Sequence, residues 1–464
     1  MATLVMKFGG SLTSDVKRLT RVAQVIMAES LAWKRMIVVV SAMAGATDTL
    51  SQAIEQAALH NAPGYRRAVA ELRESHLGLL MALFPSLPIQ HMLTAQLDNT
   101  LSTVLTTCDR IYAHREALPR DRDIVMATGE QMMVPIVTAL VRQEGLQTAS
   151  VNAESVMITD DKHQNAHPLL DVIDERVEQV IRPLLESGIV PIIAGFVGAT
   201  KTGAVTTLGR GGSDYTATTL AASLRADEVW IWTTVDGVMS ADPQLVPGAR
   251  VIPTLSYEEV GELSYFGARV LHPRAVEPLQ AQGIPLRVRN PFNLDHAGTL
   301  IQANAEAQNS SIKAVTAVDG LCLYTSGRPL DTGEFVSRIH RIVGRTVTGP
   351  VIVMQSHFRS VVVFVVPTNE GPNAVTTAKD RLSAQLTGWE IVPVKVITLM
   401  GTPGFSESAL ISPIRPLASA VGPGDRYILC VNPSEAQSVV RQLHKLTENS
   451  VDSVDQQVWP PTRS

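Results

Sequence analysis

The sequence predicts an α/β protein: a doubly wound sheet sandwiched by helices, followed by two small α+β domains. Three observations support this prediction. Short, mostly apolar runs of strand length recur through the first 300 residues, and the run at residues 36–40 is fully apolar, as expected of a strand covered on both faces. Nearly every such run ends in a glycine-rich or polar loop. After residue 311 the pattern changes to closely spaced strands and helices with few loops of that kind.

The first 300 residues alternate strands and helices. The sequence LVMKF at residues 4–8 predicts a short strand that leads directly into two glycines, and helical spacing of apolar residues predicts a helix over 16–31. Residues 51–116 are expected to be helical throughout. Further buried strands are expected at residues 36–40, 123–127, 188–194, 228–232 and 284–288. This alternation is typical of doubly wound sheets, in which ligands bind at the carboxyl ends of the strands.

The loop with the sequence TTLGRGGSDY, residues 206–215, is the centre of the predicted site, and a helix is expected to follow over 216–224. Its three glycines allow a sharp turn and a close approach to a ligand. The N-terminus of a helix carries partial positive charge and favours a phosphate or carboxylate. Arg210 adds a planar guanidinium that fits a carboxylate. Asp214 is unusual in an anion site unless a metal ion or an ammonium group also binds there.

Other candidate ligand-binding residues follow other strands of the predicted sheet. Together they predict a site for at least two anionic groups, one of which we expect to be a polyphosphate. The chain has neither the GxxxxGK[ST] motif of P-loop enzymes nor the signature motifs of protein kinases. The residues of this predicted site are Lys7, Gly9, Gly10, Ser41, Thr47, Glu130, Arg210, Gly211, Gly212 and Asp214.

A polar stretch at residues 302–311 predicts a linker, and the residues after it predict a separate module. Strands are expected at 312–318, 350–354, 360–366, 394–399 and 426–431, and helices near 333–344, 373–385 and 434–446. Two successive rounds of these elements indicate two α+β units with a ligand-sensing or dimerising role. Residues after about 449 are polar and are expected to fray.

The composition is that of an ordinary globular protein. Of 464 residues, 45% are hydrophobic and 18% are charged, and the length allows two or three domains. A net charge of −5 gives no basic surface for nucleic acid. The three cysteines lie far apart, which disfavours a disulfide framework or a structural zinc site. The chain shows no basic leader and no long uncharged apolar run, so we expect no signal peptide, no membrane span and a cytoplasmic location.

Six motifs occur in order along the first 300 residues: KFGGS, VSAM, GE, GF, TLGRGGSDYTA and FGARVLHP. They closely resemble the motifs of the aspartate kinase (aspartokinase) family, within the amino-acid kinase superfamily, and the tail resembles the paired ACT domains of that family. The resemblance implies a catalytic domain over residues 1–301 and an ACT-like, ferredoxin-like domain over 312–393. It implies a second, short ACT-like domain over 394–449, which could be intertwined with the first.

The resemblance implies the phosphorylation of the β-carboxylate of L-aspartate by ATP with Mg²⁺. The products would be 4-phospho-L-aspartate and ADP, in the first step of lysine, threonine and methionine biosynthesis. A free carboxylate with a pKa of about 3.9 is already ionised at neutral pH, so no general base is required. The remaining difficulty is to bring two anions together, which requires positioning and charge neutralisation.

The resemblance also implies roles for single residues. Lys7 would bridge the β- and γ-phosphates, Asp214 would orient Lys7 or the metal, and Arg210 would clamp the α-carboxylate of aspartate; these three are the expected catalytic residues. Glu130 would bind the ammonium group of the substrate. The expected substrate-binding residues are Ser41, Thr47, Glu130, Phe196, Arg210 and Ser213. The expected nucleotide-binding residues are Lys7, Phe8, Gly9, Gly10, Gly211, Gly212, Thr233, Thr234, Met239, Gln244, Arg269 and Val270, and no residue is assigned as a metal ligand.

The chain departs from the family pattern on the nucleotide side. Where the family usually has a Thr-Asp pair, a tyrosine and an arginine, this chain has Thr233-Thr234, Met239 and Gln244. Arg269 stands where lysine is common. The loss of an acid, an aromatic ring and an arginine predicts an altered nucleotide affinity or preference.

The second ACT-like unit also departs from the family, because four prolines interrupt the helix expected between residues 399 and 426. Two interpretations therefore stay open. The ACT-like domains could bind lysine or threonine as a feedback effector, or they could serve only to assemble a homodimer or higher homo-oligomer.

Two other functions stay open as well. The chain could be an amino-acid kinase with a different acid substrate, although the pair of Arg210 and Glu130 favours an α-amino acid. It could instead be a weakly catalytic ACT-type amino-acid sensor. The presence of Lys7, Arg210 and Asp214 argues against the sensor.

Overall fold

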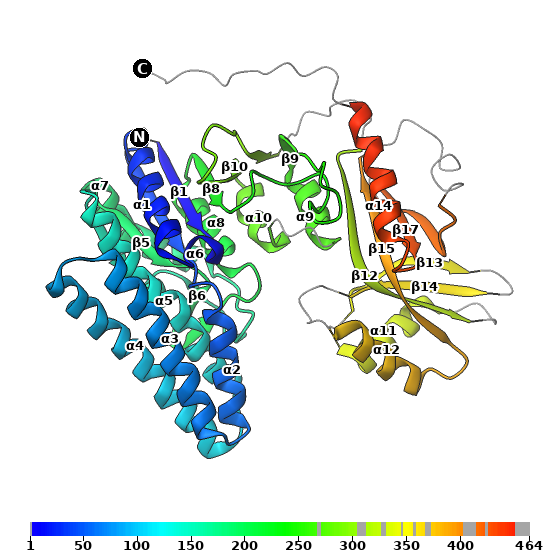
Figure 1. Ribbon diagram of the computed structural model, residues 1–464, viewed down its shortest axis with the longest axis horizontal. Coiled ribbons are helices and arrows are strands. Elements are labelled where there is room, and N and C mark those ends of the chain that lie inside the picture. The colour runs from blue at the N-terminus through cyan, green and yellow to red at the C-terminus, as the bar shows by residue number, and fades with distance from the viewer. Residues whose placement is uncertain are drawn as a thin grey trace. The chain divides into compact units, whose positions relative to one another are not determined.

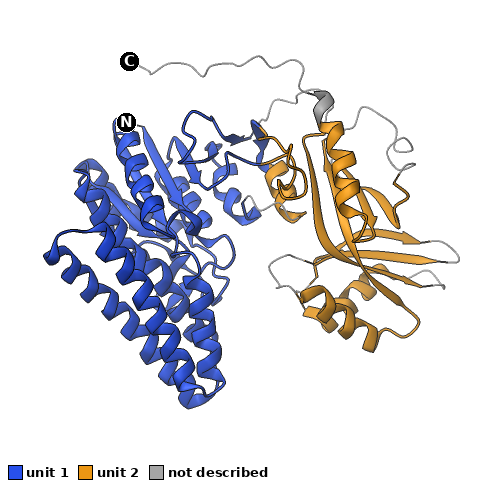
Figure 2. Cartoon of the chain, viewed as in Figure 1, with its two compact units in different colours: residues 1–238, 253–257, 271–305 blue, residues 239–252, 258–270, 306–464 orange. Residues whose placement is uncertain are grey.

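The chain folds into two compact units, coloured separately in Figure 2. The computed structural model in Figure 1 describes residues 2–266, 271–303, 312–325, 331–344, 347–355, 359–366, 373–401, 414–422 and 426–450. The first unit comprises Met1–Val238, Pro253–Tyr257 and Leu271–Ala305. The second unit comprises Met239–Ile252, Glu258–Val270 and Glu306–Ser464.

An eight-stranded sheet forms the centre of the first unit, in the order β3-β5-β2-β1-β8-β10-β11-β9. Six neighbouring strands are parallel: β3 (Thr148–Val151), β5 (Val190–Ala194), β2 (Arg35–Val40), β1 (Thr3–Phe8), β8 (Glu228–Trp232) and β10 (Leu286–Arg289). β11 (Thr299–Gln302) runs antiparallel to β10, and β9 (Thr254–Ser256) lies parallel to β11. All six residues of β1 are buried, because helices cover both faces of this part of the sheet. The predicted doubly wound sheet is confirmed.

A smaller sheet supports the loop that the sequence singles out. It has the order β4-β6-β7, formed by β4 (Ile158–Thr159), β6 (Val197–Thr200) and β7 (Val205–Thr207). β6 and β7 form an antiparallel hairpin, and β7 ends immediately before Leu208. The hairpin therefore delivers the glycine-rich loop to the start of the next helix.

The helices of the first unit surround the large sheet and extend beyond it as a bundle, visible in Figure 1 for α2 to α5. Asp15 caps the first of them by accepting a hydrogen bond from the amide of Arg18 at 2.9 Å. The predicted helical region is confirmed as three helices, separated near Asn61 and Ser86, where prolines occupy the first turns. The helices are α1 (Val16–Ser30), α2 (Ala46–Ala58), α3 (Ala62–Leu83), α4 (Leu87–His114), α5 (Pro119–Gln143), α6 (Leu170–Arg176), α7 (Arg182–Glu186), α8 (Gly212–Leu224) and α10 (Pro273–Gln280).

The strand predicted at residues 123–127 is wrong, because these residues lie inside α5. A short apolar run cannot distinguish a buried strand from a helix that is buried on most sides. α5 is such a helix, and it is also long and apolar enough to cross a membrane by length and composition alone. In the window that meets this test, 72% of the residues are buried inside the protein, as expected of a core helix.

The second unit contains one six-stranded antiparallel sheet, in the order β13-β14-β12-β15-β17-β16. The strands are β12 (Ala314–Thr325), β13 (Pro350–Gln355), β14 (Ser360–Val365), β15 (Glu390–Met400), β16 (Ala418–Gly422) and β17 (Arg426–Val431). β12 and β15 pair along eleven registered positions, so both α+β halves share one sheet. The domain boundary expected after residue 393 would fall inside β15, and the assignment of the halves to two domains stays a prediction.

Two sets of helices complete the core of the second unit. α11 (Thr332–Val343) and α12 (Ala374–Gln385) pack on the sheet around Leu321 and Phe364. α14 (Ala436–His444) packs around Ile397 and Leu429, and this part of the core includes Ala241 and Val246. The segment 239–252, which the sequence places inside the first domain, is therefore part of the second unit's core. The unit also contains most of α9 (Tyr257–Tyr265) and the short helix η6 (Lys445–Ser450).

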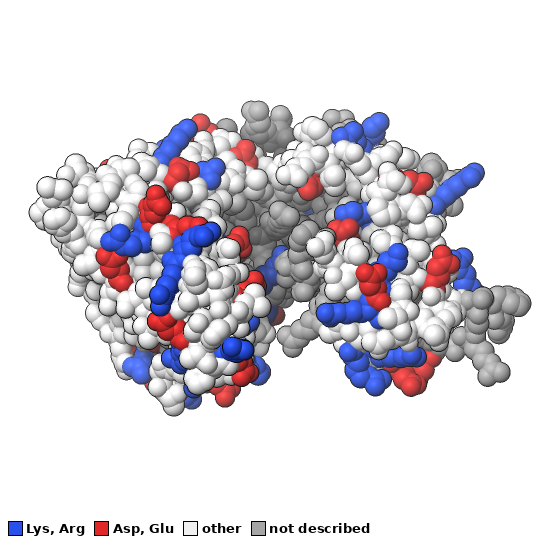
Figure 3. Space-filling model, turned by 60° about the horizontal axis from the view of Figure 1, so that its bottom comes forward, with Lys and Arg blue, Asp and Glu red and all other residues white. Residues whose placement is uncertain are grey.

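Charged side chains of both signs are interspersed on the face shown in Figure 3. No large patch of one sign is visible there, in agreement with the small net charge.

The buried aromatic ring of Phe364 tests the packing of the second unit. Phe364→Ala removes a fully buried side chain between the sheet and its helices, and we expect a loss of about 3–5 kcal/mol in the free energy of unfolding. Val353→Ala is the control, since Val353 is 41% exposed, and should change stability by no more than about 0.5 kcal/mol. Chemical denaturation of both variants measures the difference, and equal stability losses would contradict the packing described.

Candidate active site

The candidate site lies at the carboxyl edge of the parallel strands of the first unit. In register, Phe8 lies beside Val40 and Trp232, and Val40 lies beside Ala194. The strands therefore end together, and the loops that begin at Gly9, Ser41, Gly195 and Thr233 emerge at one edge. Hydrogen bonds tie these loop starts to their neighbours: the Ser41 amide donates to Phe8 O at 3.2 Å, and the Gly195 amide donates to Val40 O at 2.9 Å.

The glycine-rich loop reaches this edge through left-handed glycines. Gly209 and Gly211 have φ values of +75° and +70°, which only glycine adopts without strain. A Cβ atom at Gly211 would lie 2.4 Å from the Cβ atom of His272, so steric space also requires glycine there. α8 begins at Gly212, four residues earlier than expected, and its first turn therefore contains Ser213 and Asp214.

Lys7 and Asp214 form an ion pair that joins β1 to α8. Lys7 Nζ lies 2.6 Å from Asp214 Oδ1, and the two side chains are only 11% and 14% exposed. Such a pair is expensive to break because each charge would remain largely buried without its partner. This contact agrees with the expectation that Asp214 orients Lys7.

Glu130 is a buried acid next to this ion pair. Burial raises the pKa of Glu130 to about 8. A hydrogen bond from the Ala42 amide and the positive charge of Lys7 both lower this pKa, but by less than burial raises it. Its Oε2 atom is buried and has no hydrogen-bond partner among the described residues. A buried acceptor without a partner is costly, and a ligand that brings an ammonium group would satisfy it.

The loop after β5 is pressed against the first turn of α8. A Cβ atom at Gly195 would lie 2.5 Å from that of Ser213, and one at Gly212 would lie 2.6 Å from Cδ2 of Phe196. Phe196 has a φ of +67°, and its amide donates to Thr216 Oγ1 at 3.0 Å. This packing fixes Phe196 and Ser213 beside each other. The sequence analysis missed Thr216, because its partner lies 20 residues away.

Two further expected residues flank this edge. Thr47 lies half-buried in the first turn of α2, behind Gly45, which has a left-handed conformation. Arg210 is exposed, and its charge acts on His272. Burial lowers the pKa of His272, and the positive charges of Arg274 and Arg210 lower it further.

The residues expected on the nucleotide side are divided between the two units. In the first unit the Thr233 amide donates to Arg289 O at 2.9 Å, and Thr234 is exposed. Met239 and Gln244 belong to the second unit, where the amide of Gln244 donates to Asp242 Oδ1 at 2.9 Å. Arg269 and Val270 lie outside the described residues.

The sequence analysis missed the residues that hold the loop after β8. Asp236 accepts hydrogen bonds from Asn290 Nδ2 at 2.7 Å and from Asn293 Nδ2 at 2.9 Å. These bonds tie the loop after β8 to the loop after β10. The partners lie more than 50 residues apart, so only an Asn-rich stretch after a predicted strand could have indicated them.

Among the described residues, no group of three or more His, Cys, Asp or Glu side chains could hold a metal ion.

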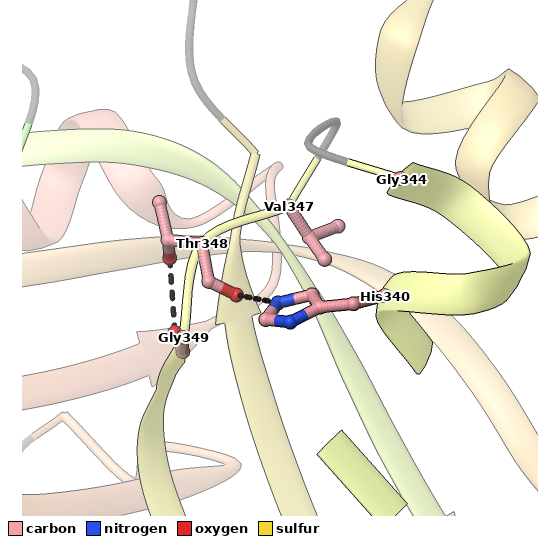
Figure 4. Close-up of a pocket in the computed structure, with 5 residues that line it drawn as sticks. All are labelled: His340, Gly344, Val347, Thr348 and Gly349. Carbon is pink, nitrogen blue, oxygen red and sulfur yellow. Dashed lines mark hydrogen bonds between the residues drawn. The ribbon is translucent and has the colours of Figure 1, made fainter. Parts of the chain in front are cut away.

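A separate cavity of about 450 Å³ lies in the second unit. Figure 4 shows the hydrogen bond between a ring nitrogen of His340 and the Thr348 carbonyl oxygen, 3.2 Å long, beside it. The described lining residues are His340, Gly344, Val347, Thr348 and Gly349. Backbone groups and small side chains predominate, and this lining specifies no ligand.

The burial of Glu130 predicts that the stability of the protein depends on pH. The pKa of Glu130 is about 8 in the folded chain, whereas the ordinary value for a glutamate side chain is 4.5. The unfolded chain therefore loses this proton first as the pH rises. Wild-type stability should therefore fall relative to that of Glu130→Gln, by about 1.4 kcal/mol per pH unit between roughly pH 5 and 8, and then level off. Denaturant unfolding at several pH values measures this difference. Exposed Glu116→Gln is the control, and a difference that does not change with pH would contradict the burial of this acid.

Comparisons with known proteins agree with this geometry. The model of the amino acid kinase family matches residues 2–290. Bifunctional aspartokinase/homoserine dehydrogenase 2 of Arabidopsis thaliana is 32% identical over 406 residues, which cover 85% of this chain and 43% of that protein. The chain spans 43% of the length of each of the first three curated relatives it matches.

Two crystal structures of E. coli aspartokinase III share the fold at 25% sequence identity. The complex with aspartate and ADP (R-state) gives a TM-score of 0.77, covering 96% of this chain and 99% of that one. The complex with lysine and aspartate (T-state) gives a TM-score of 0.80, covering 97% and 100%. Since the family model matches well over half of the residues, including every strand end described here, the chain belongs to the amino acid kinase family.

Proposed function

We propose that this protein is an aspartate kinase, which transfers the γ-phosphoryl group of ATP to the β-carboxylate of L-aspartate. The products are 4-phospho-L-aspartate and ADP, in the first step of lysine, threonine and methionine biosynthesis. The observation that carries this proposal is the buried, unpartnered Oε2 of Glu130 beside the ion pair of Lys7 and Asp214. An acid of this kind suits a substrate with an ammonium group, while the surrounding cations and amides suit its carboxylates and a phosphate.

The substrate is held by groups of opposite charge. Glu130 accepts hydrogen bonds from the α-ammonium group, and Arg210 binds the α-carboxylate with its planar guanidinium. Ser41, Thr47, Phe196 and Ser213 line the same pocket. With both α-substituents held, the β-carboxylate is the group left to attack the nucleotide. Positioning of this kind can contribute a large part of the rate enhancement, because the attacking group is already ionised.

Lys7 neutralises charge on the phosphates. Asp214 holds its ammonium group at 2.6 Å, which fixes Lys7 Nζ at the edge where the strands end. The amides of Gly10 and Gly211 would donate hydrogen bonds to phosphate oxygens, as glycine-rich loops and helix N-termini do in anion sites. The Gly212 amide donates instead to Gly209 O at 3.0 Å, and the Gly9 amide donates to Trp232 O at 3.4 Å. A preorganised cation and fixed amide dipoles stabilise the charge that develops during phosphoryl transfer.

ATP and Mg²⁺ are the cofactors that this site would use. The glycine loops and Lys7 provide the donors that a nucleotide phosphate needs, and the solved E. coli aspartokinase III with ADP supports this choice. Bound Mg²⁺ would neutralise phosphate charge. The departures at Thr234, Met239 and Gln244 remove an acid, an aromatic ring and an arginine, so we expect the nucleotide affinity or preference to differ from that of typical relatives.

The second unit supports a proposal for regulation and assembly. Its two α+β halves act as paired ACT-like domains over residues 312–393 and 394–449, through which the chain forms a homodimer or a higher homo-oligomer. Lysine is present in one solved relative, E. coli aspartokinase III. Lysine or threonine is therefore the amino-acid effector to test on this chain, and we place the enzyme in the cytoplasm.

Formation of an aspartyl hydroxamate tests the reaction. With ATP, Mg²⁺ and hydroxylamine, the wild type should give product with L-aspartate and little with L-glutamate. Lys7→Ala should reduce kcat by at least about 100-fold, because it removes the cation that neutralises the transferring group. Lys17→Ala, at an exposed position of α1, is the matched control and should keep its activity within about twofold.

Product with another acid but not with aspartate would identify a different amino-acid kinase. If neither acid reacts while the variants remain folded, the alternative of an amino-acid sensor is favoured and the kinase proposal is rejected.

A further inference from the structure

Asp123 is a buried carboxylate for which the proposed mechanism has no use. Its side chain is fully buried on α5. It lies seven residues before Glu130, and this spacing of nearly two full turns places both acids on the same face of the helix. A buried carboxylate persists in a protein only where hydrogen bonds compensate for its desolvation, so its partners indicate what it holds.

The partners of Asp123 come from two segments that are distant in sequence. Oδ1 accepts a hydrogen bond from Thr207 Oγ1 at 2.6 Å and from the Gln164 amide at 3.0 Å. Oδ2 lies 2.5 Å from Nδ1 of His163. Thr207 is the last residue of β7, directly before residues 208–211, which we call the arginine loop because they contain Arg210. One carboxylate thus ties α5 to the strand that carries this loop.

Residues 160–167, which contain His163 and Gln164, form a closed turn that we call the bracing turn. Asp160 closes its base: Oδ1 accepts from the His167 amide at 2.8 Å, and the Asp160 amide donates to His167 O at 2.9 Å. The Ala166 amide donates to Thr207 O at 3.0 Å. The bracing turn is therefore bonded along the end of β7 as well as to Asp123.

The bracing turn also contacts the arginine loop itself. A Cβ atom at Gly209 would lie 2.9 Å from both Asn165 Oδ1 and Gln164 O, so the two segments touch with no space for a side chain. Arg274 joins them from the other side, since its Nη1 donates to Asn165 Oδ1 at 2.5 Å and to Leu208 O at 3.5 Å. The first half of the arginine loop is thus enclosed by the turn, β7 and Arg274.

We propose that Asp123 is a positioning residue that, through Thr207 and the bracing turn, fixes the arginine loop so that Arg210 meets the substrate carboxylate. This inference rests on the proposed role of Arg210. An arginine side chain can adopt many rotamers, so the backbone of Arg210 must be fixed if its guanidinium is to bind one carboxylate in a defined orientation. Displacement of a positioning group by about 1 Å can cost about 100-fold in rate.

A neighbouring acid provides a matched control. Asp121 lies two residues earlier on α5, is equally buried, and accepts a hydrogen bond from Arg110 Nη2 at 2.6 Å. Its partner belongs to α4 rather than to the arginine loop. Asp121→Asn should therefore weaken the packing of α5 without moving Arg210, and a general loss of stability can be separated from a loss of positioning.

Steady-state kinetics of Thr207→Val, Thr207→Ser, Asp123→Asn and Asp121→Asn test the proposal. Valine keeps the shape of Thr207 but removes the donor to Asp123, whereas serine keeps the donor. We expect Thr207→Val and Asp123→Asn to raise the KM for aspartate at least about tenfold, with a change of less than about threefold in the KM for ATP. Thr207→Ser and Asp121→Asn should keep the wild-type KM for aspartate. A wild-type KM in folded Thr207→Val, or an equal rise in Asp121→Asn, would overturn the proposal.

Limited proteolysis with trypsin gives a readout that does not depend on the reaction. We expect cleavage after Arg210, followed by mass spectrometry, to be at least about tenfold faster in Thr207→Val and Asp123→Asn than in the wild type, Thr207→Ser or Asp121→Asn. If the wild type does not phosphorylate aspartate, the proposed function fails, while faster cleavage in these two variants still supports the positioning of the loop. Equal cleavage rates in the wild type and all variants would reject the proposed positioning of the arginine loop.

Discussion

The ion pair between Lys7 and Asp214 is the interaction on which the candidate site depends. It joins the central strand of the sheet to the first turn of α8, so the loop before that helix cannot move away from the strand ends without exposing a buried charge. The neighbouring loops are close enough that Gly195 and Gly211 leave no space for a Cβ atom. The site is therefore held by charge at its centre and by close backbone contacts around it.

In the proposed function, the arrangement would separate the groups that neutralise phosphate from those that recognise the acceptor. Lys7 and the glycine amides lie where the strands end, and Arg210 lies on a loop that continues into the same helix. Glu130 comes from α5, a helix otherwise devoted to the core, and burial raises its pKa to about 8 even beside the charge of Lys7. A substrate ammonium group would replace the proton of this acid. In the proposed function, the ammonium group of the substrate would thus be recognised by a buried acid, and its α-carboxylate by the exposed Arg210.

The strands that carry the site were predictable because each is a short, mostly apolar run followed by a glycine-rich or polar loop, and both signals are local. The strand expected at 123–127 failed because α5 is buried on most sides and has no polar face to reveal its helical period. The hydrogen bond from Thr207 to Asp123 spans 84 residues, and no local pattern could indicate it. Packing of residues 239–252 into the second unit was hidden for the same reason, since Ala241 and Val246 belong to a core cluster whose other buried members lie between Ile312 and Leu443.

We expect Glu130 to exchange its proton for the ammonium group of an amino-acid substrate when that substrate binds. Isothermal titration calorimetry of aspartate binding near pH 7, in buffers with different ionisation enthalpies, counts the protons released. With a pKa of about 8 for Glu130, the wild type should release about one proton per aspartate bound, and Glu130→Gln should release none. The same proton count for both proteins, with aspartate bound to each, would contradict this expectation.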